Sequence, residues 1–395
     1  MPENRRPALA SRLAFIDCFR GIAILGVLAY HAALEVDHNP LHWRDGFWDW
    51  TAFDPIRSAF IVMLQWSSLP TLFFLTSGFV VHFARQKRPD APLGRFVLRR
   101  WVRLFVPYLV VLVLFGVLFP PTVVPLDTRY GLINFVVHLA PVFNLHDETL
   151  WSINPSFWYV ATELQLCLLY PLLLWAAARV GWQRTLIALF VVQVAAQLGC
   201  TVIELGTEGS SEATLGNLWL ARSAPSYCLS WALGAWIADR WHSGQLVRPP
   251  VSGLVAAALA ALFLTVWQPG SVLAMTAVAL AGASGLMLLL SRRSEAKAPG
   301  RVLASVLWLS RISLAMYLLN QPILHFLQEH VASGFASPLA QLAITFFGGA
   351  LVVVPLAWVF TQTVETPLCR FVLARIDGWL DRRPYVAPVR PPVRP

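Results

Sequence analysis

Charged side chains are scarce in this sequence. Asp, Glu, Lys and Arg make up 13% of its 395 residues, about half the share found in soluble globular proteins, and this scarcity excludes an ordinary cytosolic enzyme. Hydrophobic residues make up 57%. Apolar runs of roughly 20 residues, the length that crosses a bilayer as a helix, recur along nearly the whole chain. They leave no stretch long enough for a separate soluble domain.

Cysteine is scarce as well. The five Cys residues are scattered and form neither a C-x-x-C motif nor a Cys/His cluster, so neither a zinc site nor a disulfide framework is indicated. We therefore expect no metal and no permanently bound cofactor. The net charge of +9 does not indicate nucleic-acid binding, because the Lys and Arg residues lie between apolar runs rather than on one soluble face.

Apolar runs bounded by charged residues, Pro and Gly predict ten transmembrane helices. They cover residues 13–34, 59–83, 104–120, 157–178, 185–203, 218–238, 251–267, 272–291, 304–327 and 339–362. The segment 130–143 is apolar but too short to span a bilayer, which favours a surface or re-entrant piece. The sequence therefore predicts an all-α polytopic membrane protein with about ten transmembrane helices.

The Lys and Arg residues are unevenly distributed between the predicted loops. If the N-terminus is cytoplasmic, 25 of the 30 fall in inner segments. Only Arg44, Arg57, Arg129 and Arg222 fall in outer ones, and Arg311 lies within the ninth span. This asymmetry agrees with the positive-inside rule. Because the number of predicted spans is even, we expect both termini to be cytoplasmic, in a multi-pass protein of the cell (inner) membrane.

Three regions follow from this topology. They are a cytoplasmic N-terminal tail (1–12), a transmembrane domain (13–365) and a basic, Pro-rich cytoplasmic tail (366–395) that we expect to be disordered. The first span should stay in the protein, because Asp17 and Arg20 interrupt its apolar region and no signal-peptide cleavage site follows.

The two longest predicted outer loops, 35–58 and 121–156, are acidic and rich in aromatic residues such as Trp151. Trp and Tyr collect at the membrane interface of most membrane proteins, and this is the simpler explanation. Aromatic faces also stack on sugar rings, so a contact with a glycan stays open.

Ionisable groups inside a span cost several kcal/mol unless they are paired or hydrated, so each one is a candidate functional residue. Arg20 and His31 lie 11 residues apart in the first span. At 100° per residue this brings them within about 20° of one helical face, roughly 16 Å apart along the axis. The arrangement suits an extended substrate with an anionic end near Arg20 and a reacting end near His31. It is equally consistent with an interfacial Arg20 beside Asp17 and a His31 that only hydrogen-bonds within the packing.

Three arginines, Arg99, Arg100 and Arg103, open the predicted third span. Arg100 and Arg103 share a helical face at i,i+3 spacing, and guanidinium groups bind phosphates in bidentate fashion. Anchoring of the span by the positive-inside rule explains the same residues equally well. The spacing alone leaves both interpretations open.

Glu163 lies inside the predicted fourth span, where an unpaired carboxylate is costly. It either orients His31 or satisfies a hydrogen bond between helices. Ser77 and Gly78, in the second span, remove side-chain bulk and allow close approach of a ligand or a neighbouring helix. Helix packing is the commoner reason for such a pair.

Several of these positions fall in patches that resemble the membrane-bound acyltransferase-three family, integral membrane enzymes that acylate sugars and other acceptors. The patches are IDCFRGIAILGVLAYH (16–31), FFLTSGF (73–79), RRWVRLFVPY (99–108), WYVATELQLCLLYP (158–171), the weaker SRISLAMYLLNQPIL (310–324) and the closing ETPLCR (365–370). The resemblance runs from about residue 13 to 370. Each patch is loose by itself, but their order and spacing together are specific. In the fifth patch this chain has Asn320 where the family usually carries a His, which removes any proton role there.

The resemblance implies a mechanism and a set of site residues. An acyl-CoA, most simply acetyl-CoA, binds from the cytoplasm as the donor substrate, and His31 acts either as general base on the acceptor hydroxyl or through an acyl-histidine intermediate. The implied residues are His31 and Glu163 for catalysis, Arg20, Arg99, Arg100, Arg103, Ser77 and Gly78 for donor binding, and Trp158, Tyr159, Tyr317 and Asn320 for substrate binding.

We therefore expect a membrane-bound O-acyltransferase that modifies a hydroxyl of a glycan, such as a polysaccharide, or of a glycosylated acceptor. It would be surrounded by membrane lipid, and a homodimer stays open. The alternative is a transporter or flippase that uses His31, Glu163 and Arg20 as a proton or substrate path. Against it, the sequence has no evident internal repeat and no matching pair of broken helices. A third possibility is a non-catalytic scaffold, in which Arg20 and His31 are freely replaceable.

Overall fold

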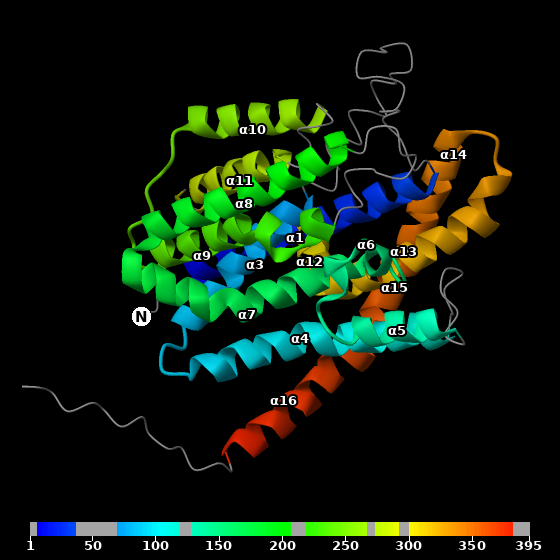
Figure 1. Ribbon diagram of the computed structural model, residues 1–395, viewed down its shortest axis with the longest axis horizontal. Helices are drawn as coiled ribbons and strands as arrows, with labels where there is room; N and C mark the ends of the chain where they lie inside the picture. Colours follow the sequence, from blue (N-terminus) through cyan, green and yellow to red (C-terminus); the bar gives the residue numbers. More distant parts are fainter. Residues whose placement is uncertain are drawn as a thin grey trace, which may run out of the picture.

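The computed structural model describes residues 6–36, 69–118, 128–206, 219–266, 273–291 and 300–381. Within these ranges the chain forms helices joined by turns and short loops, without a strand (Figure 1). The predicted all-α class is confirmed for this part of the chain. Most of the long helices run alongside one another, so their side chains can form one continuous interior.

The helices differ widely in length. The longer ones are α1 (Arg6–Val36), α3 (Leu69–Gln86), α4 (Leu93–Val113), α7 (Phe157–Val180), α8 (Trp182–Gly206), α9 (Cys228–His242), α10 (Val251–Val266), α11 (Ala274–Ser291), α12 (Arg301–Arg311), α13 (Ser313–His330), α15 (Gly349–Phe360) and α16 (Thr366–Asp381). The shorter ones are α5 (Arg129–His138), α6 (Asp147–Leu150) and α14 (Pro338–Ala343). With ten residues, α5 is too short to cross a bilayer, in agreement with the prediction for 130–143.

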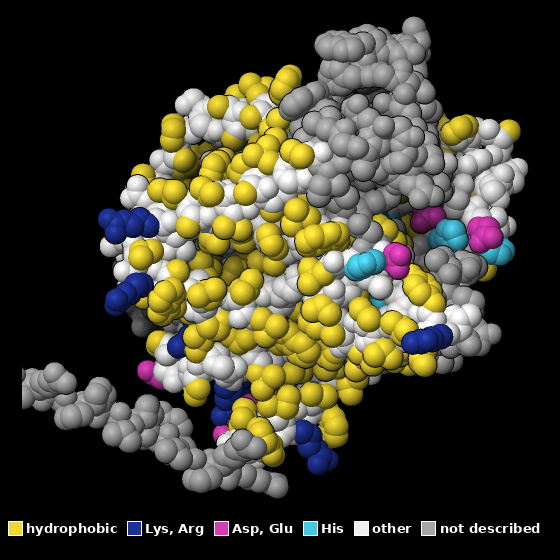
Figure 2. Space-filling model, viewed as in Figure 1, with side chains coloured by type: hydrophobic (Ala, Val, Ile, Leu, Met, Phe, Trp, Pro, Cys, Tyr) yellow, Lys and Arg dark blue, Asp and Glu magenta, His cyan; other side chains and the backbone are white. Residues whose placement is uncertain are grey.

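Five described helical segments are long and apolar enough to cross a membrane, and a sixth results if α12 and α13 count as one bent span. The five are Ile16–Val36, Phe157–Val180, Trp182–Cys200, Ala274–Ser291 and Pro338–Asp381. In Figure 2 the middle of the visible face is largely apolar, Lys and Arg lie mainly toward one end, and the visible His side chains lie toward the other. The chain is therefore a multi-pass membrane protein. The number of ten spans stays a prediction, and part of the second one, 59–68, lies outside the described residues.

The predicted ninth span, 304–327, is wrong as a single straight helix. α12 and α13 meet at an angle of 77°. Ser310 and Ser313 donate hydrogen bonds to backbone carbonyl oxygens three residues earlier, each at 2.9 Å, and such bonds compete with regular helical bonding. Ser310 and Ser313 are buried at the bend, whereas Arg311 is exposed there and lines the same cavity as the two serines.

The predicted sixth span, 218–238, begins with two 3₁₀ turns rather than with regular helix. The hydroxyl groups of Ser223 and Ser226 both donate to the carbonyl oxygen of Leu220, at 2.8 Å. These bonds hold residues 219–226 in tight turns, and α9 starts only after them. The turns bring Arg222 into the interior, where it is 5% exposed.

The expectation of disorder for the tail 366–395 is wrong in its first half. Thr366–Asp381 is helical, as α16, and it continues a helix that runs without interruption from Pro338 to Asp381. Residues 382–395 lie outside the described residues.

The helix that contains most of the predicted third span, 104–120, begins well before that span. α4 starts at Leu93, directly after Pro92, and its first turns carry arginines that a lipid-facing helix would not tolerate. Two of them are neutralised by α16: Arg95 and Arg99 pair with Asp377 at 2.9 and 2.6 Å. This pairing explains why the helix extends beyond its apolar part.

The closest helix contact that involves a predicted site residue joins α3 to α9. A Cβ atom added to Gly78 would lie 1.9 Å from the carbonyl oxygen of Trp231, and one added to Gly234 would lie 1.9 Å from that of Leu75. Small residues on both helices thus let the two backbones touch. Gly78 serves helix packing, and the expectation that it binds the donor is not supported by its surroundings.

We expect the Gly78→Ala variant to unfold at a clearly lower temperature than the wild type, because the added methyl group meets backbone that cannot move aside. Overpacking of this kind costs about 1–3 kcal/mol. Thermal unfolding in detergent micelles measures the effect. Gly285→Ala on α11 is the matched control, since nothing lies within 4 Å of its added Cβ, and its melting temperature should stay equal or rise slightly. If Gly78→Ala kept normal stability but no longer bound the donor, this result would support a role of Gly78 in donor binding.

Candidate active site

A cavity of about 320 Å³ lies between α1, α3, α4, α7, α12 and α13. Its lining is unusually rich in charge for the interior of a membrane protein. The charged lining residues are Arg20, Arg100, Arg103, Arg311, Asp17, Glu163 and Glu365. We call this space the arginine cavity. Four guanidinium groups against three carboxylates leave a positive excess, which favours an anionic ligand.

Glu163 is held inside the arginine cavity by residues of two neighbouring helices. Its Oε1 accepts a hydrogen bond from the hydroxyl of Ser77 and lies 3.5 Å from Nη2 of Arg100. Arg100 also donates to Ser77, at 3.2 Å. The carboxylate is 1% exposed, and a charge buried so deeply persists only when it is paired. Among the described residues Glu163 contacts Ser77, Arg100 and Cys167 through Oε1, and its Oε2 has no hydrogen-bond partner. The idea that Glu163 orients His31 is therefore not supported.

The arginine cluster of α4 divides between two places. Arg100 and Arg103 line the arginine cavity, as their shared helical face predicts. Arg99 points elsewhere and pairs with Asp377 of α16. The expectation that Arg99 binds the donor is therefore not supported: its charge already serves the contact between α4 and α16.

A second and smaller cavity, of about 70 Å³, lies beside His31, and we call it the histidine cavity. Aromatic rings with polar tips form much of its wall. The aromatic and polar lining residues are Tyr30, His31, Trp151, Trp158, Arg222, Tyr317 and Gln321. A space this small and mixed in character suits a short group with a polar end.

The imidazole of His31 is held in one orientation by Asn320. Nδ1 of His31 lies 2.5 Å from Oδ1 of Asn320, and the amide nitrogen of Asn320 donates to the backbone oxygens of Met316 and Tyr317 at 3.0 and 2.7 Å. Because the amide nitrogen is used in this way, Oδ1 is an acceptor and Nδ1 of His31 carries the proton. Nε2 of the neutral ring then has a lone pair, which is what a general base or a nucleophile needs.

Asn320 does not line either of the two cavities, so the expectation that it contacts substrate is replaced by a contact with His31. The amide side chain of Asn320 has no titratable group. Its carbonyl oxygen instead determines which nitrogen of His31 carries the proton.

Arg20 and His31 lie on one side of α1, as their spacing predicts. Arg20 donates to the hydroxyl of Ser313, at 3.2 Å, and His31 pairs with Asn320. Both partners belong to α13, in its first and its third turn. The two α1 residues therefore face the same neighbouring helix.

An extended substrate that reaches from Arg20 to His31, as the sequence suggests, needs a single tunnel between them. Among the described residues two separate cavities take the place of this tunnel. Tyr317 lines both of them. The ring of Tyr159, which lines the arginine cavity, lies 5.0 Å from that of Tyr317 and 5.9 Å from that of Phe73, measured between centroids. These packed rings fill the space that a tunnel would need. Of the residues expected to bind substrate, Tyr159 thus faces the first cavity, Trp158 the second, and Tyr317 both.

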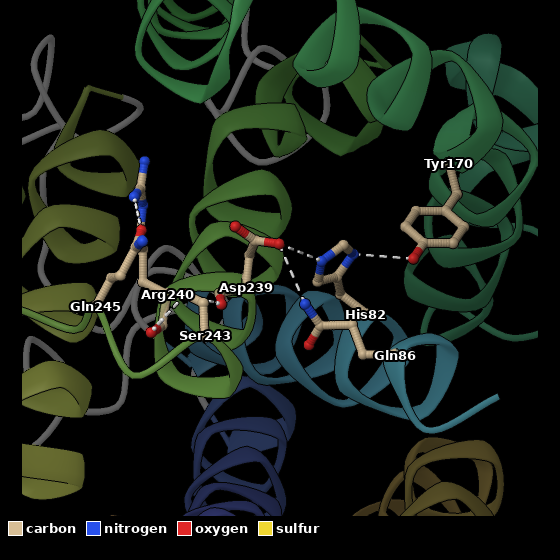
Figure 3. Close-up of polar contacts among 7 residues, drawn as sticks. All are labelled: His82, Gln86, Tyr170, Asp239, Arg240, Ser243 and Gln245. Atoms are coloured by element: carbon tan, nitrogen blue, oxygen red, sulfur yellow. Dashed lines mark hydrogen bonds and ion pairs between the residues drawn. The ribbon is translucent and has the colours of Figure 1, made fainter. Parts of the chain in front are cut away.

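Another buried histidine, His82, is fully engaged in a structural network (Figure 3). Its Nδ1 lies 2.9 Å from the hydroxyl of Tyr170, and its Nε2 lies 3.4 Å from a carboxylate oxygen of Asp239, which also accepts from Gln86. Both ring nitrogens are therefore occupied. His82 lines neither the arginine cavity nor the histidine cavity.

Sequence reasoning missed two arginines that line the cavities. Arg311 was noted only as a charge within a span, and Arg222 only as a basic residue on the outer side. A signal for Arg222 existed, because basic residues are disfavoured in outer segments. An arginine retained in such a segment is a candidate for a specific structural or functional role.

Apolar helices surround an interior with paired charges, two polar cavities and an oriented imidazole, and together they define a multi-pass membrane protein with a polar interior. Residues 13–362 match the family model of the acyltransferase-3 acyltransferase domain. Since the match covers most of the chain, the protein belongs to the membrane-bound acyltransferase-3 family and is a membrane acyltransferase. No curated protein and no solved structure matches the chain.

Proposed function

We propose that this protein transfers an acyl group, most simply acetyl, from cytoplasmic acyl-CoA to a hydroxyl of a glycan or glycosylated acceptor. The observation that carries the proposal is the tautomer of His31, which leaves Nε2 without a proton. Asn320 holds Nδ1–H and leaves Nε2 as a base beside a small, largely aromatic cavity. A neutral imidazole with a defined tautomer is suited to take the proton of a hydroxyl that attacks a thioester.

The donor is assigned to the arginine cavity. Arg20, Arg103 and Arg311 line it beside the Arg100–Glu163 pair. Guanidinium groups recognise phosphates through paired hydrogen bonds, and the phosphates are the anionic end of a CoA thioester. The pantetheine arm then extends from this cavity toward Tyr317, which lines both cavities, and the Tyr317 ring has to move aside so that the thioester reaches His31. The small volume of the histidine cavity supports a short acyl chain.

The transfer step follows from these positions. The acceptor oxygen attacks the thioester carbonyl carbon while Nε2 of His31 takes the hydroxyl proton. The tetrahedral intermediate collapses, the carbon–sulfur bond breaks, and the thiolate of CoA takes the proton back from the imidazolium. An alternative order, in which Nε2 itself attacks and carries the acyl group before the acceptor arrives, uses the same tautomer.

Replacement of Arg103 by glutamine should weaken binding of acetyl-CoA about tenfold or more, the usual size for loss of a charge-assisted hydrogen bond. The difference from wild type should shrink as salt screens the interaction. Titration calorimetry on the purified protein in nanodiscs measures it. Arg99→Gln is the matched control on the same helix, since Arg99 pairs with Asp377. If the wild type and Arg103→Gln bound acetyl-CoA equally well, Arg103 would serve only to set the orientation of its helix in the membrane.

The proposed function itself is tested with the purified protein and short acyl-CoA donors, by following release of the free CoA thiol. Mass spectrometry of surface glycans from a deletion strain should show the loss of an acyl substituent. Absence of any acyl-CoA turnover, together with movement of a glycan across vesicles without CoA, would favour the transporter instead.

A further inference from the structure

Arg222 is placed in the protein interior by contacts of its own backbone. It ends a 3₁₀ turn, and its carbonyl oxygen accepts hydrogen bonds from Nδ2 of Asn144 at 2.8 Å and from Oγ1 of Thr162 at 2.6 Å. Thr162 belongs to α7 and Asn144 to the turn before α6. The backbone of Arg222 is thus fixed by two separate elements, whichever side chain stands at this position.

The guanidinium of Arg222 lies between aromatic rings at the histidine cavity. Its carbon is 4.5 Å from the ring centre of Trp158 and 5.2 Å from that of Trp151. Stacking on aromatic faces orients a planar cation. Among the described residues that line this cavity, Arg222 carries the only permanent charge, and His31 lines the same 70 Å³ space.

Arg222 is a buried cation in a segment that the sequence predicts to be on the outer side, where arginine is uncommon. Its guanidinium stacks on two Trp rings and lines the small cavity beside His31. A positive group at this place is suited to a negative charge that develops beside the base. In acyl transfer, that charge appears on the carbonyl oxygen.

This inference rests on the proposed function. We propose that Arg222 stabilises the oxyanion of the tetrahedral intermediate that forms beside His31. When the acceptor oxygen adds to the thioester carbonyl carbon, the carbon–oxygen double bond opens and its electron pair moves to the carbonyl oxygen, which then accepts hydrogen bonds from the guanidinium. When the double bond re-forms, the carbon–sulfur bond breaks and the thiolate leaves. Arg222 is charged throughout and exchanges no proton.

The test uses water as the acceptor, so that recognition of an anionic acceptor cannot contribute. Hydrolysis of acetyl-CoA by the purified full-length protein in nanodiscs is followed through release of the CoA thiol. Arg222→Gln should lower kcat by about 10²–10³-fold, the usual cost of losing one oxyanion donor, while the KM for acetyl-CoA stays close to that of the wild type. Arg222→Lys keeps the positive charge but not the planar guanidinium group. Its kcat should lie between that of Arg222→Gln and that of the wild type.

Arg129→Gln is the control, because Arg129 is an exposed arginine of α5 outside both cavities, and its kcat should equal that of the wild type. Melting temperatures and acetyl-CoA affinities of all variants establish that the fold and the donor site are intact. An unchanged kcat in Arg222→Gln overturns the inference and leaves the proposed function standing, provided that His31→Gln is inactive. A wild-type protein that hydrolyses and transfers from none of the short acyl-CoA donors overturns both.

Discussion

Replacement of His31 by glutamine should lower turnover of acetyl-CoA by about 10²–10⁴-fold, the contribution expected of a positioned general base. Glutamine fills much of the space of the histidine, so the packing between α1 and α13 is largely kept, and its amide is not a base. No group then takes the proton of the acceptor hydroxyl. Release of the CoA thiol at saturating acetyl-CoA measures the loss in kcat.

His82→Gln is the matched control for this variant. His82 is equally buried, but its two ring nitrogens are occupied by Tyr170 and Asp239 (Figure 3). Its replacement should lower the melting temperature and leave kcat close to the wild-type value. The role of His31 would be refuted if His31→Gln kept its turnover, or if His82→Gln lost as much.

The relation between Arg20 and His31 could be predicted from the sequence because both lie on one helix. Helical geometry fixes the directions of side chains within a single element, and 11 residues make almost exactly three turns. Their common orientation toward α13 follows from this geometry. The apolar centres of several spans could be predicted for a similar reason, since they depend only on local composition.

Contacts between helices could not be predicted in this way. Whether Glu163 meets His31 or Ser77, and whether Arg99 meets a ligand or Asp377, depends on how α3, α4, α7 and α16 pack against one another. The single tunnel failed for a related reason. A helical wheel shows direction, but it does not show that the rings of Tyr159 and Tyr317 fill the space between the two ends.

The ends of helices were also poorly predicted where charged residues pair with a neighbouring helix. An arginine normally marks the limit of a span, yet α4 extends through Arg95 and Arg99 because Asp377 of α16 pairs with both. The bend between α12 and α13 likewise depends on serine hydroxyls that bond to nearby backbone. A hydropathy pattern records none of these partners.

Asn320→Leu should lower kcat about 10- to 100-fold with little change in the KM for acetyl-CoA. Leucine has the branched outline of asparagine but is bulkier and accepts no hydrogen bond, so Nδ1–H of His31 loses its partner and the tautomer with a free Nε2 is no longer favoured. Loss of a second partner that orients a catalytic histidine is costly in other enzymes for the same reason. Steady-state kinetics of CoA release measures the effect.

Asn320→Asp keeps an oxygen that accepts from Nδ1–H and should recover part of the activity lost in Asn320→Leu, although its second oxygen replaces the amide nitrogen that donates to Met316 and Tyr317. A merely structural role for Asn320 predicts instead that both variants lose activity in proportion to their stability. Nuclear magnetic resonance of protein labelled with ¹⁵N-histidine separates the two cases. The wild type and Asn320→Asp should show the His31 signals of a ring protonated at Nδ1, assigned by their absence in His31→Gln, whereas Asn320→Leu should show a mixture of tautomers. Identical His31 signals in the wild type and Asn320→Leu would contradict the positioning role, because the tautomer would then be set by something other than Oδ1 of Asn320.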